Sequence, residues 1–317
     1  GDDAIAMFTL LQADLAGWID LLGVTAVGGN SLVAPGTVSI LNQLERVERE
    51  DIPVYMGIDV PIKGFRNLEA DAVVYGGFGW TGGYRQLANY TRDYKNLGPL
   101  ENENWGMPKS MEPQEGAAVD FMIEQVHKYP GQVTIFAVGA CTNVALAVLK
   151  DPTFAETAAG IVYMGGAIDV PGNTTPLAEF NWWYDPESVA TSLRANWPYQ
   201  IVVPHDVAPK VLMAKDVYDM YAAKNNTPIS ELLVEHYGAM YAENPTRTSY
   251  AWDPITVGVF LVPDLVTRSE VRDIAIETSE GYTYGKSVTW TEGTGPYNSV
   301  PVTIVLVLSL PIGYFEV

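Results

Sequence analysis

The chain has 317 residues, of which 48% are apolar, enough for the core of one large α/β domain over residues 1–317. Its 38 acidic and 18 basic side chains give a net charge of −20, which argues against nucleic acid or membrane surfaces as partners and favours a divalent cation. Cys141 is the only cysteine, so an intrachain disulfide is excluded, and no apolar run reaches the ~18–20 residues of a membrane-spanning helix. The sequence leaves open whether the protein is cytoplasmic or secreted.

Helices and strands are expected to alternate along most of the chain. In chain order, the apolar spacing predicts a helix over 2–12, a strand over 19–27, a helix over 35–48, a strand over 52–56, a helix over 114–128, a strand over 133–138, a helix over 142–149, a strand over 161–164, a helix over 187–195, a strand over 199–203, and helices over 229–241 and 253–260. The last ~50 residues read as strands, including a buried one in the apolar run 300–313. This alternation is typical of an open, mainly parallel α/β sheet with helices on both faces.

Residues 64–111 break this pattern. They are rich in Gly, Tyr, Trp and Asn and show little periodicity. A long irregular segment inside one domain is typical of a lid or binding loop, and an ordered surface excursion is the alternative. No convincing domain linker occurs, so the segment is predicted to be a lid-like insertion in a single domain.

Several polar side chains follow directly after predicted strands: Asn30, Thr142, Asn173 and the pair His205-Asp206. In open parallel sheets, ligands bind beyond the carboxyl ends of the strands. These residues are therefore predicted to converge on one site.

Three acidic residues are candidates for a metal site. Asp2 and Asp3 begin the first predicted helix, and Asp253 begins another one 250 residues later. Taken alone, Asp2 and Asp3 are better explained as helix caps, and Asp253 could also be only a cap. Hard cations, however, take oxygen ligands from separate elements, and the remaining polar residues favour such a site.

The stretch 171–181 offers groups that bind sugar hydroxyls. Asn173, Glu179 and Asn181 supply donors and acceptors around the apolar Phe180. Turn chemistry is the alternative explanation for the asparagine, but it accounts less well for Glu179 and Asn181.

Aromatic side chains could stack on a base next to such a sugar site. Trp252 precedes Asp253 directly and is the foremost of them. Core packing is the usual fate of each of these rings. The further candidates are Trp80, Trp105, Trp182, Trp183 and Tyr250.

Other active-site motifs are absent from the sequence. His205-Asp206 resembles half of a catalytic triad, but no G-x-S-x-G elbow accompanies it. There is no Walker A sequence, and no G-x-G-x-x-G opens a first helix.

The motifs together resemble the nucleoside hydrolase family, which comprises inosine-uridine and purine-specific nucleosidases. The matching segments are Gly1-Asp2-Asp3, residues 22–30, 52–57 and 118–121, Gly-Ala-Cys-Thr-Asn at 139–143, Ala-Leu-Ala at 145–147, Met-Gly-Gly-Ala at 164–167, Asn-Thr-Thr-Pro at 173–176, Ala-Glu-Phe-Asn at 178–181, Asp-Pro-Glu at 185–187 and Asp253-Pro254. They cover roughly residues 1–290 in the family's order. The tail after about residue 290 matches poorly.

The resemblance implies a Rossmann-like single domain, a homodimer or homotetramer, and calcium-dependent hydrolysis of small-molecule ribonucleosides to ribose and free base. It implies that Asp3, the backbone carbonyl of Thr142 and Asp253 bind Ca²⁺. It also implies that the ribose hydroxyls are held by Asp2, Asn173, Glu179 and Asn181, with Asn30 and Met164 lining the pocket. The general base of the family's motif would be an Asp upstream of Gly1, so we expect a preceding segment.

The residue before the last metal-binding Asp distinguishes the members of the family. Inosine-uridine enzymes have His there, whereas this chain resembles the purine-preferring type in having Trp252. Asp2, Asn173 and Trp252 are thus the residues expected to act in the reaction. Alternatives are a pyrimidine or broad-specificity nucleosidase that uses His205 as an acid, and a catalytically silent nucleoside-binding or sugar-binding relative.

Overall fold

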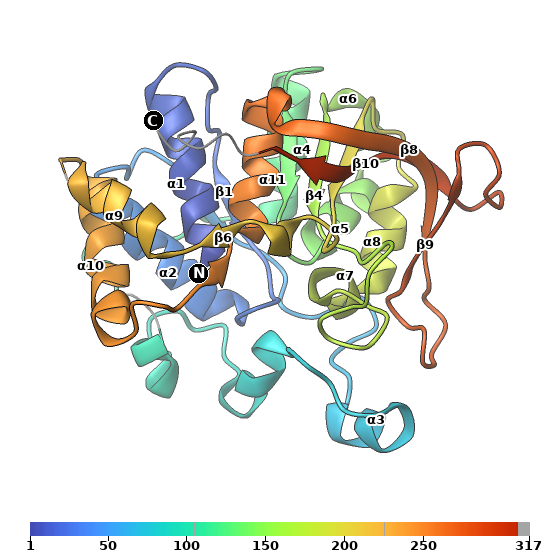
Figure 1. Ribbon diagram of the computed structural model, residues 1–317, viewed down its shortest axis with the longest axis horizontal. Helices are drawn as coiled ribbons and strands as arrows, with labels where there is room; N and C mark the ends of the chain where they lie inside the picture. Colours follow the sequence, from blue (N-terminus) through green and yellow to red (C-terminus); the bar gives the residue numbers. More distant parts are fainter. Residues whose placement is uncertain (104–105, 225, 310–317) are drawn as a thin grey trace.

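A six-stranded sheet forms the centre of the computed structural model, which describes residues 1–103, 106–224 and 226–309 (Figure 1). The strand order is β3 (Thr134–Ala137), β4 (Gly160–Met164), β5 (Gln200–Val203), β10 (Val300–Leu308), β8 (Val266–Ile276) and β9 (Ser287–Thr291). The first four are parallel, and β8 and β9 add antiparallel strands at one edge. β1 (Val24–Ala26) and β2 (Val54–Met56) form a separate parallel pair, and β6 (Leu212–Met213) and β7 (Ser249–Tyr250) an antiparallel one.

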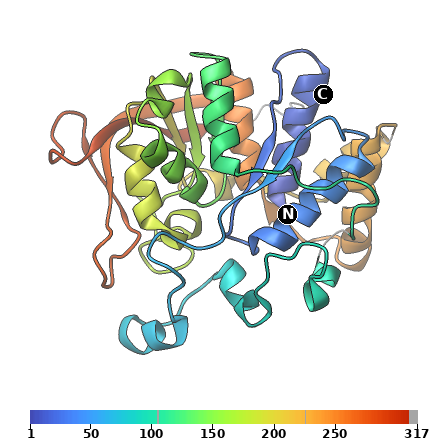
Figure 2. The ribbon, with the colours of Figure 1, turned by 180° about the vertical axis from the view of Figure 1, so that it is seen from behind.

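Helices lie on both sides of the strands (Figures 1 and 2). They are α1 (Asp2–Leu15), α2 (Val33–Arg46), α3 (Leu68–Tyr75), α4 (Ala118–Lys128), α5 (Thr142–Lys150), α6 (Phe154–Thr157), α7 (Phe180–Tyr184), α8 (Pro186–Leu193), α9 (Lys215–Ala223), α10 (Pro228–Glu243) and α11 (Trp252–Leu261). Short 3₁₀ helices occupy Gly82–Asn89 (η1), Gly98–Glu103 (η2), Ala208–Lys210 (η3) and Pro263–Leu265 (η4).

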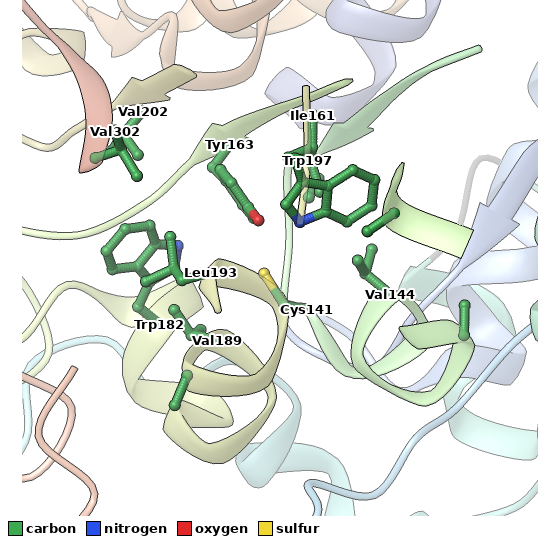
Figure 3. Close-up of a cluster of buried hydrophobic side chains, with 14 of the residues drawn as sticks. Cys141, Val144, Ile161, Tyr163, Trp182, Val189, Leu193, Trp197, Val202 and Val302 are labelled. Carbon is green, nitrogen blue, oxygen red and sulfur yellow. The ribbon is translucent and has the colours of Figure 1, made fainter. Parts of the chain in front are cut away.

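The two faces of the sheet bury two separate apolar cores, because successive side chains of a strand point to opposite faces. Val202 and Ile304 pack with α4, α5 and α8 in one core, which also buries Cys141 (Figure 3). Val203 and Val305 pack with α1, α2, α10 and α11 in the other. The predicted open, mainly parallel sheet with helices on both faces is therefore confirmed.

The strand predicted over 19–27 is wrong in its length. Only Val24–Ala26 pairs with β2. The carboxylate of Asp14 accepts a hydrogen bond from the backbone N of Leu21 at 2.7 Å, which holds the preceding residues in a return loop behind α1. Of the apolar run 300–313, Val300–Leu308 forms β10, and residues 310–313 lie outside the described residues.

The segment 64–111 is only partly irregular, because it contains α3, η1 and η2. It extends below the body of the molecule in both views (Figures 1 and 2). The buried Asp59 anchors it by accepting hydrogen bonds from Arg92 at 3.0 Å and from the Tyr90 hydroxyl at 3.2 Å. In the part of the chain that the structure describes, no helix is both long and apolar enough to cross a membrane.

Candidate functional site

Three carboxylates from two helices that are far apart in the sequence meet at one point. The first turn of α1 carries Asp2 and Asp3, the first turn of α11 carries Asp253, and these two helices pack against each other. One carboxylate oxygen from each of the three residues lies within 4.8 Å of the other two. The predicted convergence of these acidic residues is therefore present in the fold.

Like charges at this distance repel, and the ionisation of the cluster reflects it. Burial, and next the charge of Asp3, raise the pKa of Asp2 to about 7. Burial, followed by the charges of Asp2 and Asp3, raises the pKa of Asp253 well above its usual range. Without a compensating cation the cluster has to hold protons, and its three oxygens are the groups here that could hold a metal ion.

Thr142 lies in the first turn of α5, next to the end of β3. Its hydroxyl donates to the buried carboxylate of Asp185 at 2.6 Å. Its neighbour Asn143 links two loops, since it donates to the backbone O of Ala26 at 2.9 Å and accepts from the backbone N of Ile58 at 3.0 Å. The Thr142 hydroxyl is thus used internally, which leaves the backbone carbonyl as the predicted metal ligand of this residue.

Each of the two predicted sugar-binding asparagines has one end of its carboxamide hydrogen-bonded within the protein. Asn173 accepts from the backbone N of Phe180 through Oδ1 at 2.8 Å, so its Nδ2 group remains as a donor. Asn181 donates through Nδ2 to the backbone oxygens of Val138 and Met164, both at 3.2 Å, so its Oδ1 remains as an acceptor. A sugar hydroxyl both donates and accepts, and this pair offers one partner of each kind.

Glu179 is buried and caps α7. Its carboxylate accepts from the backbone N of Asn181 at 2.8 Å, of Gly166 at 3.0 Å and of Trp182 at 3.2 Å. A carboxylate has about four lone-pair sites, so roughly one is left for a substrate hydroxyl. Burial outweighs these bonds and raises the pKa of Glu179 to about 7. Its charge also contributes to the raised pKa of Asp253, which ties the two groups to the same site.

The remaining predicted pocket residues lie at the same edge of the sheet. Met164 ends β4, and its backbone O and Sδ both accept from Asn181. Trp252 lies in the first turn of α11 beside Asp253, with its ring centroid 5.1 Å from that of Tyr250. Among the described residues its Nε1 atom is buried without a hydrogen-bond partner.

The structure separates the two members of the His205-Asp206 pair. The carboxylate of Asp206 accepts from the backbone N of Ile168 at 2.9 Å and of Asp169 at 2.7 Å, so it fixes the loop after β4. Burial lowers the pKa of His205 below its ordinary value. No triad-like contact joins the two side chains within the described part of the chain.

Two further residues are Trp80 and Tyr237. The sequence analysis named Trp80 only as an aromatic candidate and gave Tyr237 no role. Trp80 donates from its indole Nε1 to Oδ1 of the exposed Asn30 at 2.6 Å. On α10, burial and then the charge of Asp2 raise the pKa of Tyr237. Neither effect has a local sequence signal, because each links segments distant in the chain. Trp105 lies outside the described residues.

Comparisons with known proteins agree with this geometry. A sequence model of the inosine-uridine preferring nucleoside hydrolase family matches residues 1–308. A Schizosaccharomyces pombe protein without a described function is 34% identical, over 94% of this chain and 89% of its own. A probable uridine nucleosidase of Arabidopsis thaliana is 29% identical, covering 90% and 81%. A pyrimidine-specific ribonucleoside hydrolase of Citrobacter koseri is 30% identical, covering 90% and 84%.

Solved structures resemble the fold over nearly its whole length. A plant nucleoside hydrolase superposes with a TM-score of 0.74 at 25% identity, covering 97% of this chain and 91% of the other. A purine-preferring ribonucleoside hydrolase from Gardnerella vaginalis superposes with a TM-score of 0.69, covering 92% and 87%. Its identity of 20% supports the fold alone.

Proposed function

This chain belongs to the inosine-uridine preferring nucleoside hydrolase family and is an N-ribosyl hydrolase, and from that premise we propose calcium as its cation and purine ribonucleosides as its preferred substrates. The observation that carries the proposal is the meeting of Asp2, Asp3 and Asp253. Two oxygen ligands of one Ca²⁺, each at 2.3–2.6 Å, can lie up to about 5 Å apart, and the 4.8 Å limit of this cluster fits that span.

Asp3, Asp253 and the backbone carbonyl of Thr142 would hold the ion. A calcium ion bound there would orient the sugar hydroxyls and a water molecule for attack at the anomeric carbon. The ion also explains why three carboxylates are tolerated in one buried place, since a divalent cation compensates their repulsion. Asp264, which follows the other end of α11, is exposed and needs no such partner.

The protein's own side chains would hold the ribose. Asp2 accepts from a sugar hydroxyl, Asn173 donates through Nδ2, and Asn181 accepts through Oδ1. The lone pair left on Glu179 accepts from one further hydroxyl. Such contacts, made to the part of the substrate that does not leave, favour the distorted sugar of an oxocarbenium-like transition state.

Cleavage transfers the bonding electrons of the N-glycosidic bond to the base while water adds to the anomeric carbon. The proton of that water goes to a carboxylate that acts as general base. The departing base has to be neutralised, and the ring of Trp252 would stack on a purine and raise the basicity of its N7. Pyrimidines have no N7, which is the physical reason for proposing purines.

A second candidate is hydrolysis of pyrimidine ribonucleosides. Similar proteins with a described activity include a probable uridine nucleosidase and a pyrimidine-specific ribonucleoside hydrolase. For such a substrate the leaving base would need a proton donor, and His205 is the imidazole nearest in sequence to the strand ends of the site.

The test is turnover of inosine, guanosine, adenosine, uridine and cytidine by the protein with its natural N-terminus. We expect the purine nucleosides to have the higher kcat/KM. Replacement of Trp252 by Ala should lower kcat on inosine by roughly 5–100-fold, as for loss of one base–aromatic stack, and change ribose affinity far less. An unchanged kcat on inosine would refute the stacking role. Faster hydrolysis of uridine than of inosine would support the second candidate. Binding of nucleosides without turnover would indicate a catalytically silent relative.

A further inference from the structure

A short strap bridges two loops that carry predicted sugar-binding residues. The strap comprises residues 79–83, and its backbone is hydrogen-bonded at both ends. At one end the N of Gly79 donates to the O of Thr174 at 2.8 Å, and the Thr174 hydroxyl donates to the O of Trp80 at 2.9 Å. At the other end the N of Gly83 donates to the O of Gly29 at 2.7 Å. The strap therefore spans from the turn at Asn173 to the loop at Asn30.

Two glycines let the strap lie flat on these loops. A Cβ at Gly79 would come within 2.4 Å of the backbone O of Asn173. A Cβ at Gly82, where φ is +50°, would come within 2.5 Å of the backbone O of Gly29. A side chain at either position would clash with the backbone of the loops. The close contact between the strap and these loops therefore requires glycine at both positions. The backbone of the strap gives Trp80 a defined position.

The indole of Trp80 fixes the orientation of one carboxamide. Its Nε1 lies 2.6 Å from Oδ1 of Asn30. Because an indole N–H is a donor only, the atom facing it has to be the oxygen of Asn30, and the Nδ2 group must point elsewhere. The guanidinium of Arg85 lies 4.5 Å from the Trp80 ring centroid and donates to the Thr81 hydroxyl at 3.2 Å, so the ring is held from its other side.

We propose that Trp80 is a positioning residue that acts through Asn30, presenting the Nδ2 group of that side chain as a hydrogen-bond donor to a ribose hydroxyl. The proposal rests on the nucleosidase function proposed above. It gives Asn30 the same polarity as Asn173, whose oxygen is likewise held by the protein. The two donors complement the acidic cluster. When its carboxylates are ionised, their oxygens can accept a hydrogen bond from a hydroxyl but cannot donate one.

A double-mutant cycle distinguishes this role from a direct contact between the Trp80 ring and the nucleobase. Trp80→Phe keeps an aromatic ring and removes the N–H. We expect it to raise KM for inosine and uridine alike by roughly 2–10-fold, the effect of one hydrogen bond, with kcat nearly unchanged. In an Asn30→Ala background the same substitution should have no further effect. A full additional loss there would overturn the proposal, because Trp80 would then act without Asn30.

Asn30→Asp tests the donor itself. An aspartate still accepts from the indole but cannot donate to a hydroxyl, so this variant should lose as much as Asn30→Ala, and wild-type KM would overturn the proposal. Trp80 is 45% exposed, so its variants should fold. The control is Trp18→Phe, at a residue that follows α1 and is 60% exposed, and it should behave as wild type.

The same double-mutant cycle is then measured for the affinity of ribose by calorimetry. An enzyme inactive on every nucleoside would count against the proposed function, whereas additive effects on ribose affinity would count against Trp80 alone.

Discussion

At the scale of single residues, the acidic cluster accounts for most of the chemistry of the site. Asp2, Asp3 and Asp253 each offer an oxygen close enough to share one ion, and under the proposal above that ion would offset their repulsion. Asn173 and Asn181, each with one end of its carboxamide held by the protein, would bind the sugar.

Neutralising Asp253 should remove the stabilisation of the folded protein by calcium. In the wild type, calcium at 100 times its Kd should raise Tm by roughly 4 °C, since binding to the folded state alone stabilises it. Asp253→Asn keeps the shape of the side chain, removes one ligand charge and relieves repulsion. We therefore expect the metal-free variant to melt above the metal-free wild type and to respond little to calcium.

The measurement is thermal unfolding with and without EGTA, together with metal analysis of the purified protein. Asp264→Asn, at the other end of α11, is the matched control and should keep the wild-type response. One equivalent of calcium retained by Asp253→Asn would contradict the assignment of this ligand.

The cluster also predicts a dependence of stability on pH. In the metal-free protein Asp2 keeps its proton to about pH 7, whereas its ordinary pKa is 3.8, so between these values the folded state binds more protons than the unfolded chain. The free energy of unfolding should therefore fall as the pH rises towards and through 7. Bound calcium stabilises the ionised carboxylates and should abolish this fall. Urea unfolding between pH 5.5 and 8 checks it, and a metal-free stability that rises with pH would refute it.

The sequence could name candidate site residues but not their hydrogen-bonding partners. Asp2, Asp3, Asp253, Asn173 and Asn181 stand in motifs that resemble those of the family, and their roles in the site stay predictions. Which end of each carboxamide faces the ligand depends on partners far away in the chain. The contact between Trp80 and Asn30 joins residues 50 positions apart, and no local pattern encodes it.

At the scale of elements, prediction succeeded where the apolar period was long. The helix over 142–149 and the strand over 161–164 match α5 and β4 to within one residue at each end, because burial fixes them on one face. The five-residue α7 was missed, since its first turn depends on the buried cap of Glu179. α3 was missed as well, because none of its residues is buried and no apolar stripe marks it.

The anchor of the segment 64–111 can be tested at this scale. Arg92 is 44% exposed and Asp59 is fully buried, so Arg92→Ala would leave a buried carboxylate with only its other donors. We expect a loss of about 1–2 kcal/mol in the free energy of unfolding, less than for a fully buried pair because solvent screens Arg92. Proteolysis within residues 76–103 should become faster.

An exposed ion pair in the same segment provides the control for that loss. Lys95 and Glu112 are each more than half exposed, so Lys95→Ala should cost less than about 0.5 kcal/mol. Equal losses for the two variants, by urea unfolding, would show that Asp59 does not anchor the segment.

At the scale of the whole molecule, the fold brings together two helices that are far apart in the sequence. α1 and α11 pack side by side over one face of the sheet (Figure 1), and only this packing unites residues 250 positions apart. The net charge of −20 suits a protein that binds a cation and a neutral nucleoside and avoids polyanions. The sheet supplies the rigid frame, and the loops at its edge supply the chemistry.

The most direct test of the central claim is release of reducing sugar from inosine and uridine by the protein with its natural N-terminus, with calcium and with EGTA. We predict release from inosine that EGTA abolishes and that added calcium restores. Undiminished release after complete removal of calcium would contradict the assignment of the ion. No release from either nucleoside with calcium bound would contradict the proposed hydrolysis.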